Sequence, residues 1–272
     1  MPPITGKRYL LLWCVVPAAA VFVYPYVKDA SVALKWLGTS LSLLVLFFSI
    51  IVHEICHGVI SAIGGDTTAQ KAGRLSLNPI NHISLIGSIV LPLILFLTKA
   101  PMVLGWAKPV PLNPLELREY PKYQNATVMA GPLSNFCLAY VSFIAFIGVG
   151  LIYKLLYHQA QVPTMVGFSE IVPIGNIPYA GFWYMLFQML NMGIFINLSL
   201  GVFNLIPFPP LDGFWLLKGV LPKTITVFLT KIQIWGFVLI IIALQTKIFL
   251  FFLYPIFALG GLSVAVINIL LG

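Results

Sequence analysis

Charged residues are scarce in this chain of 272 residues: only 8% are Asp, Glu, Lys or Arg, whereas 60% are hydrophobic. Soluble globular domains carry about 25% charged residues, so this class is excluded. The chain has only three cysteines, and all lie in apolar runs. An odd number of such cysteines excludes a disulfide framework. The basic residues are scattered at the ends of apolar runs, where they would face anionic lipid, so we expect no nucleic-acid partner.

Long apolar runs are what the chain has in abundance. Six of them approach or exceed the length that a bilayer crossing needs, at residues 9–27, 36–64, 126–156, 179–205, 224–244 and 248–271. The first run begins like a signal peptide but is long enough to remain as an uncleaved span. No stretch between the runs is long enough for a separate soluble domain. We therefore expect an all-α polytopic membrane protein with about six transmembrane helices, forming a single domain over 1–272 with its core at 36–221.

The run at 36–64 carries the polar sequence His53-Glu54-Ile55-Cys56-His57. Histidines four residues apart lie on one face of a helix, where two imidazole nitrogens can bind one tetrahedral zinc ion. Glu54 lies beside that face, placed to take a proton from a water at the metal. These histidines could instead only hydrogen-bond neighbouring helices. However, an ionisable side chain near the bilayer centre costs about 2.5–3.5 kcal/mol, which favours a metal site.

A catalytic zinc site uses three protein ligands and a water, so one ligand is missing from this motif. Asp212 is the one other acidic residue embedded among apolar residues. It could cap a short helix expected over 214–221. The three prolines just before it favour a ligand role, because an interrupted helix can project a carboxylate inward. His82 and His158 lie in expected loops and are weaker candidates.

Two motifs together resemble the site-2 protease family of intramembrane zinc metalloproteases: the one at 53–57 and Asn204-Leu-Ile-Pro-Phe-Pro-Pro-Leu-Asp212-Gly213. Three further stretches are similar to a compact prokaryotic branch of that family, namely those at 73–79, 105–109 and 130–135. The link at 158–178 is too short for the PDZ domain that other members insert. The resemblance implies one zinc ion per chain held by His53, His57 and Asp212. It also implies that Glu54 is the catalytic base and that Asn135 and Asn204 lie close to the site.

The predicted function is that of a zinc metalloendopeptidase. It would use metal-activated water to hydrolyse a peptide bond in a transmembrane or juxtamembrane segment of another membrane protein. Two alternatives stay open: a membrane metal-ion transporter, in which Glu54 would be a ligand, and a non-catalytic membrane scaffold that retains the motifs. The expected partners are membrane-protein substrates and the lipid bilayer. The sequence specifies neither the substrate nor the oligomeric state.

The ligands also predict the topology. His53 and His57 lie near the end of one run and Asp212 just beyond the end of another, so both runs must end on the same side of the membrane. The runs at 126–156 and 179–205 already supply two crossings. The segment at 84–98, which follows a short β-like stretch at 75–77, should therefore be re-entrant or lie against the bundle. Lysines and arginines collect on this side, which predicts that it and the N-terminus face the cytoplasm of a prokaryotic cell.

Overall fold

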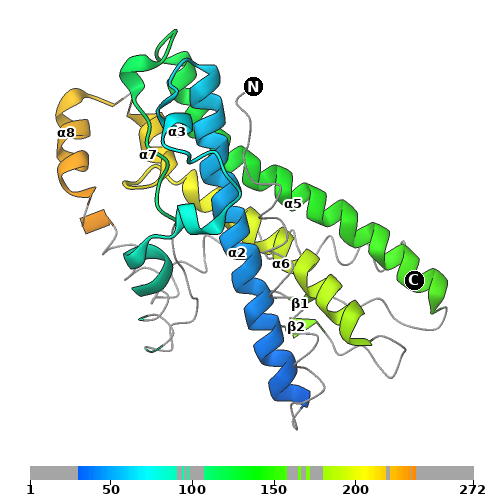
Figure 1. Cartoon of the computed structure of the whole chain (residues 1–272). Helices are drawn as coiled ribbons and strands as arrows, with labels where there is room; N and C mark the ends of the chain where they lie inside the picture. Colours follow the sequence, from blue (N-terminus) through cyan, green and yellow to red (C-terminus); the bar gives the residue numbers. More distant parts are fainter. Residues whose placement is uncertain are drawn as a thin grey trace. The chain divides into compact units, whose positions relative to one another are not determined.

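The computed structural model describes residues 30–90, 107–157, 180–218 and 221–233, together with short pieces at 94, 97, 165–166, 170–171 and 235–236. Most of this part of the chain is helical (Figure 1). The three long helices are α2 (Ala30–Ile63), α5 (Lys122–Leu156) and α6 (Ala180–Asn204). The predicted helical character is confirmed.

Each long helix contains a stretch that is long and apolar enough to cross a membrane. These candidate spans are Leu37–Ile63, Lys122–Leu156 and Gly181–Asn204. The predicted runs at 9–27 and 248–271, and most of the run at 224–244, lie outside the described residues. The total of six spans therefore stays a prediction.

The remaining described elements are short. They are α3 (Thr68–Lys71), a 3-10 turn at Pro79–His82, a π-helical turn at Leu85–Val90, a 3-10 turn at Pro114–Glu116, the strands β1 (Met165–Val166) and β2 (Glu170–Ile171), α7 (Asp212–Leu217) and α8 (Lys223–Lys231). The two strands pair antiparallel, Met165 opposite Ile171. In the stretch expected to be β-like, Ser76 forms an isolated bridge. Most of the predicted re-entrant segment after residue 90 lies outside the described residues.

Helix α2 is one continuous helix of 34 residues, which corresponds to a length of about 51 Å. Its sequence has no proline and an almost unbroken series of apolar side chains. The helix ends at Ile63, where the sequence turns to Gly64-Gly65, as the glycine pair predicts. Gly65 has a φ of +111°, a backbone conformation that favours glycine and that ends the helix.

The described residues divide into two compact units. The first is drawn from 50–135 and 200–252 and includes the second half of α2, the start of α5, α7 and α8. Ala69, Leu75 and Val110 form a small buried cluster in it, with Val59 packed against them. A Cβ atom at Gly58 would come within 2.6–3.2 Å of all three, so this glycine lets the loops pack directly on α2. The single domain expected from the sequence stays a prediction.

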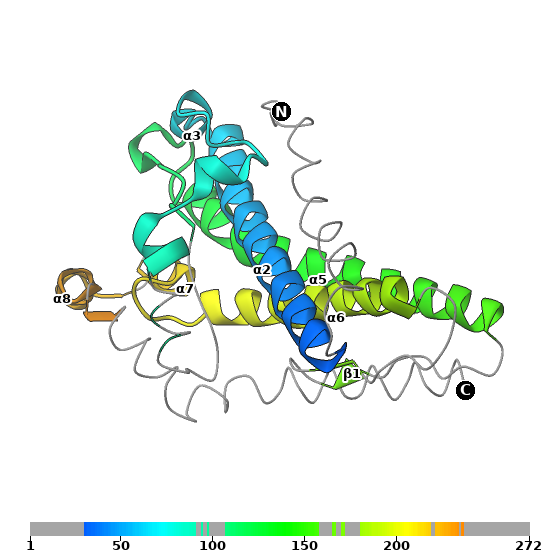
Figure 2. The same cartoon turned by 60° about the horizontal axis from the view of Figure 1, so that its bottom comes forward.

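The second unit is drawn from 30–49 and 136–199 and joins parts of the three long helices. Aromatic side chains of α5 and α6 pack edge to face in it: the ring centroid of Tyr153 lies 5.2 Å from Trp183 and 5.5 Å from Phe187. Gly193 packs against Ser142, where a Cβ atom would lie 2.5 Å from the serine hydroxyl. Aromatic packing and a small residue thus hold α5 close to α6. Figure 2 shows these helices from a second direction.

Candidate metal centre

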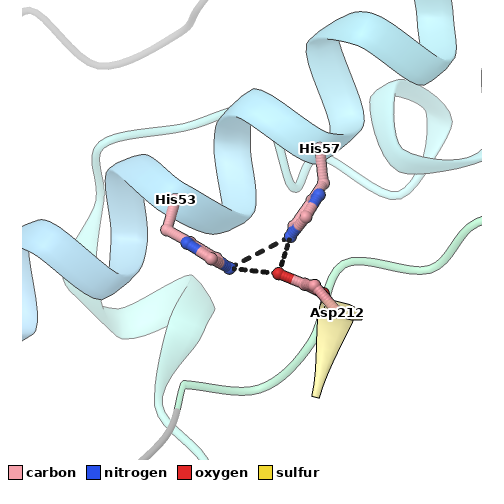
Figure 3. Close-up of side chains that lie close together, drawn as sticks. All are labelled: His53, His57 and Asp212. Carbon is pink, nitrogen blue, oxygen red and sulfur yellow. Dashed lines mark hydrogen bonds and ion pairs between the residues drawn. The ribbon is translucent and has the colours of Figure 1, made fainter. Parts of the chain in front are cut away.

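Two histidines of α2 and one aspartate of α7 converge within the first unit (Figure 3). His53 Nε2 and His57 Nε2 lie 3.0 Å apart. Asp212 Oδ2 lies 3.1 Å from the first nitrogen and 3.3 Å from the second. Both histidines are buried. The regular 3.6-residue helix places both imidazoles on the same face, as their spacing predicts.

The hydrogen bonds of the two imidazoles determine which ring nitrogen carries the proton. His53 Nδ1 lies 2.6 Å from Asn135 Oδ1, and His57 Nδ1 lies 2.7 Å from the Thr127 carbonyl oxygen. Both partners are oxygen acceptors, so each Nδ1–H donates. In the neutral imidazole, the Nε2 lone pair of each ring then points toward the other and toward Asp212.

Two imidazole lone pairs and the negatively charged carboxylate of Asp212 therefore converge on one point. Among the described residues, no N–H or O–H donor reaches Asp212 Oδ2, although this oxygen is buried. Ligand atoms 2.0–2.1 Å from a tetrahedral zinc ion lie about 3.3–3.4 Å from one another, close to the separations here. The donor set of two imidazoles and one carboxylate thus fits a zinc ion with an open fourth position.

The backbone of α5 lies directly against the two imidazoles at Gly131. A Cβ atom on this residue would lie 2.4 Å from His57 Nε2 and 2.6 Å from His53 Nε2. Only glycine leaves this space to the ligand atoms. Gly131 lies in the stretch at 130–135, and it lets the α5 backbone approach the two histidines closely.

The position of Asp212 depends on the irregular turn between α6 and α7. Phe208 N–H donates to the Ile206 carbonyl and Leu211 N–H to the Phe208 carbonyl, which folds the proline-rich stretch tightly. A Cβ atom at Gly213 would lie 2.2 Å from the Leu205 carbonyl oxygen, so glycine is required there. Leu211, and not Asp212, occupies the cap position of α7, and no side chain caps this helix. Asp212 thus turns toward the histidines instead of capping its own helix.

Glu54 lies on α2 next to His53 and is half-buried. Its Oε2 accepts a hydrogen bond of 2.8 Å from the Val110 backbone N–H. This amide belongs to an extended segment, 107–113, that is hydrogen-bonded along the second half of α2 and to the loop that follows it. Lys108 N–H donates to the His82 carbonyl at 2.8 Å, and Asn113 N–H donates to Asp66 Oδ2 at 2.7 Å.

The chain is similar to known peptidases. The family model for Peptidase family M50 matches residues 113–244, which include Asp212. A protein of Bacillus subtilis (strain 168) named "Putative zinc metalloprotease YwhC" is 30% identical over 222 residues, covering 80% of this chain and 86% of the relative. The chain belongs to peptidase family M50. No solved structure matches it.

Membership of family M50 confirms the resemblance to the site-2 proteases. The M50 peptidase is a membrane-embedded metalloendopeptidase, and its family implies a metal at the centre, with zinc as the expected ion. Family membership establishes this class of protein.

The other predicted site residues of the M50 peptidase differ in what they contact. Asn135 is fully buried and contacts His53. Asn204 donates to the Leu200 carbonyl at 3.0 Å, one turn earlier in α6. His82 is buried and its Nε2 bonds the Ser76 carbonyl at 2.7 Å. Burial lowers the pKa of His82, which keeps the ring neutral. His158 lies outside the described residues.

Sequence reasoning missed the roles of Thr127 and Val110, which act through backbone groups and so leave no signal in the residue type. Asp66 follows the two glycines at the end of α2. It is fully buried, and Ser61 Oγ, Thr68 N–H and Asn113 N–H all donate to its carboxylate. Burial alone would raise the pKa of Asp66, but these donors outweigh it and hold the pKa below its usual value. Asp66 thus fastens the end of α2 to the extended segment.

Proposed function

We propose that this M50 peptidase is a zinc-dependent intramembrane endopeptidase that cleaves transmembrane or juxtamembrane segments of membrane proteins. One zinc ion per chain is held by His53, His57 and Asp212, and Glu54 is the catalytic base. The observation that carries the proposal is the position of two of the three donor groups, the imidazoles of His53 and His57, within a helix that can cross the membrane. The candidate span runs to Ile63, and both histidines lie inside it.

The depth of the histidines follows from helix geometry. At 1.5 Å per residue, His57 lies about 9 Å and His53 about 15 Å from the end of α2 at Ile63. The hydrocarbon core is about 30 Å thick, so a span that ends near the surface keeps both imidazoles below the headgroups. A peptide bond that reaches them must therefore enter the membrane region. This supports substrates that are themselves membrane proteins, and the lipid bilayer as the medium of the reaction.

The chemistry follows from the donor set and from Glu54. When bound there, zinc supplies the Lewis acidity that makes water nucleophilic near neutral pH and polarises a peptide carbonyl. Among the described residues, the Val110 amide is the hydrogen-bond donor to the Glu54 carboxylate, and it occupies Oε2. We therefore assign to Oε1 the transfer of a proton from the attacking water to the leaving amine.

The neighbours of the two histidines have positioning roles in this proposal. The Asn135 side chain and the Thr127 carbonyl each accept an Nδ1–H, which directs the Nε2 lone pairs toward the metal. Such partners also raise the basicity of the ligand nitrogens. Asn204 bonds within its own helix, and we give it no part in the reaction.

The proposed topology keeps the segment at 84–98 from crossing the membrane. The Lys108 amide donates to the His82 carbonyl, so the two ends of the stretch between these residues meet at one place. Basic residues are frequent in the part of the chain that runs from the end of α2 to the start of α5, at Lys71, Arg74, Lys108, Arg118 and Lys122. The positive-inside bias therefore supports a cytoplasmic active-site side and N-terminus, in a prokaryotic cell membrane like that of the bacterial relative.

A reconstituted assay tests the proposed function. Purified protein in liposomes is given a single-span reporter, and the cleaved bond is located by mass spectrometry. We expect cleavage within or directly beside the transmembrane segment, and none with the His57→Ala variant. Cleavage confined to a soluble reporter domain, or equal cleavage by the variant, would contradict the proposal.

A further inference from the structure

The Arg74 side chain is buried although it lies outside the three candidate spans, with 7% of the residue exposed. Gly73, with a φ of +65°, precedes it, and the Arg74 amide donates to the Ala69 carbonyl at 2.9 Å, so the chain turns sharply inward after α3. Leu75 then enters the cluster with Ala69 and Val110. These contacts bring the guanidinium of Arg74 against the extended segment.

The guanidinium contacts two successive carbonyl groups of that segment. Its Nη2 donates to the Lys108 carbonyl and, at 3.3 Å, to the Pro109 carbonyl. The buried Nε–H has no partner among the described residues. Burying an arginine for two carbonyl contacts while one N–H stays unpaired costs free energy. The cost indicates that the contacts matter for something other than folding alone.

The next backbone amide after these carbonyls is the one that binds the catalytic base. Val110 N–H donates to Glu54 Oε2 at 2.8 Å. Residues 109 and 111 are prolines, which carry no N–H, so Val110 has the one amide donor within this triplet. The direction of that amide is determined by the peptide planes that Arg74 holds. Arg74 and Glu54 also attract each other electrostatically, which offsets part of the effect of burial on the pKa of Arg74.

We infer that Arg74 is a positioning residue for the reaction: it holds the 108–110 backbone so that the Val110 amide fixes the orientation of the Glu54 carboxylate. The inference rests on the proposed function, in which Glu54 is the base. Arg74 touches neither the metal ligands nor the reacting atoms. Its loss should therefore change the rate of the chemical step and leave zinc content and substrate affinity unchanged.

The test compares kcat, KM and zinc content in liposomes for wild type, Arg74→Met and Arg74→Lys. Arg118→Met is the matched control, because Arg118 is an exposed arginine of the same unit. We expect Arg74→Met to lower kcat by about 10–100-fold, the scale on which a misplaced catalytic group acts, with KM and zinc unchanged. Arg118→Met should match wild type. Added guanidinium ion should restore much of the kcat of an Arg74→Ala variant.

Three outcomes would overturn the inference. They are a wild-type kcat in Arg74→Met, a loss of kcat that parallels a loss of bound zinc, and a loss of kcat in Arg74→Ala that added guanidinium does not restore. If Arg74→Met yields no folded protein, zinc-loaded Arg74→Ala carries the test, and a wild-type kcat there without added guanidinium overturns the inference. Glu54→Gln, measured alongside, separates the two proposals. Activity in Glu54→Gln contradicts the proposed function, whereas an inactive Glu54→Gln with a fully active Arg74→Met contradicts the inference alone.

Discussion

Gly131 is the residue whose replacement should harm the metal centre by size alone. In Gly131→Ala the added methyl group would overlap both ligand nitrogens. The imidazoles must then move apart, so zinc affinity should fall by at least about tenfold, the lower end of what disturbed ligand positioning costs. Zinc competition with a fluorescent chelator measures this.

The matched control for Gly131→Ala lies in the same helix. A Cβ atom at Gly148 of α5 meets nothing within 4 Å. Gly148→Ala should therefore bind zinc as wild type does. Equal zinc affinity in the two variants would show that α5 does not approach the histidines this closely.

At the residue scale, the sequence predicts that the two histidines share one face of α2, because residues four apart lie on the same side of an unbroken α-helix. Asp212 could be identified as the acidic residue that follows three prolines in apolar sequence, whereas the position of Asn135 required the family resemblance. Gly131 lies in the stretch at 130–135 without a predicted role of its own, since its contact depends on how α5 packs. Arg74 lies in the motif at 73–79 without a predicted role, because no local pattern shows which carbonyl groups a buried arginine will meet.

Asp66 joins two elements, the end of α2 and the extended segment, and this junction should depend on pH. Asp66→Asn removes a buried carboxylate that accepts three hydrogen bonds, so it should lower the stability at neutral pH by about 1–3 kcal/mol. Thermal unfolding of the detergent-solubilised protein measures the difference. Glu119→Gln, at an exposed ion pair, is the control and should change little.

The sign of the pH dependence follows from the lowered pKa of Asp66. The pKa of Asp66 in the folded protein is below its unfolded value of about 3.9, so the ionised carboxylate stabilises the fold. This stabilisation is fully present above about pH 3.9. It is lost as the pH falls through the folded pKa. The difference between wild type and Asp66→Asn should therefore be constant from about pH 5 to 7 and shrink in stronger acid. A difference that grows on acidification would contradict this role.

At the element scale, apolar length predicts the long helices closely: the run at 126–156 lies within α5, and the run at 179–205 matches α6 to within one residue at each end. The extended segment was less predictable. Its prolines exclude a helix, but its path along α2 is determined by tertiary hydrogen bonds from Val110 and Asn113. Such bonds join residues distant in sequence and have no periodic signal.

At the scale of the whole molecule, the proposed topology predicts which side of the membrane each loop faces. Single cysteines at Lys71 and Lys108, in a chain whose native cysteines are changed to serine, should both resist an impermeant maleimide in intact cells. Both lysines are exposed, so the introduced thiols are accessible. Leu156→Cys, at the opposite end of α5, should be labelled. Labelling at Lys108 but not at Lys71 would show that the segment between them crosses the membrane.

The most direct test of the proposed mechanism measures zinc and turnover on the same samples of wild type and Glu54→Gln in liposomes. A glutamine fills nearly the same volume but cannot accept the proton of water. Both proteins should contain one zinc per chain, while turnover by Glu54→Gln should fall by about 10²–10⁴-fold, the usual contribution of a general base. A transporter that used Glu54 as a ligand would lose zinc in the variant instead. That result, or a fully active Glu54→Gln, would contradict the central claim.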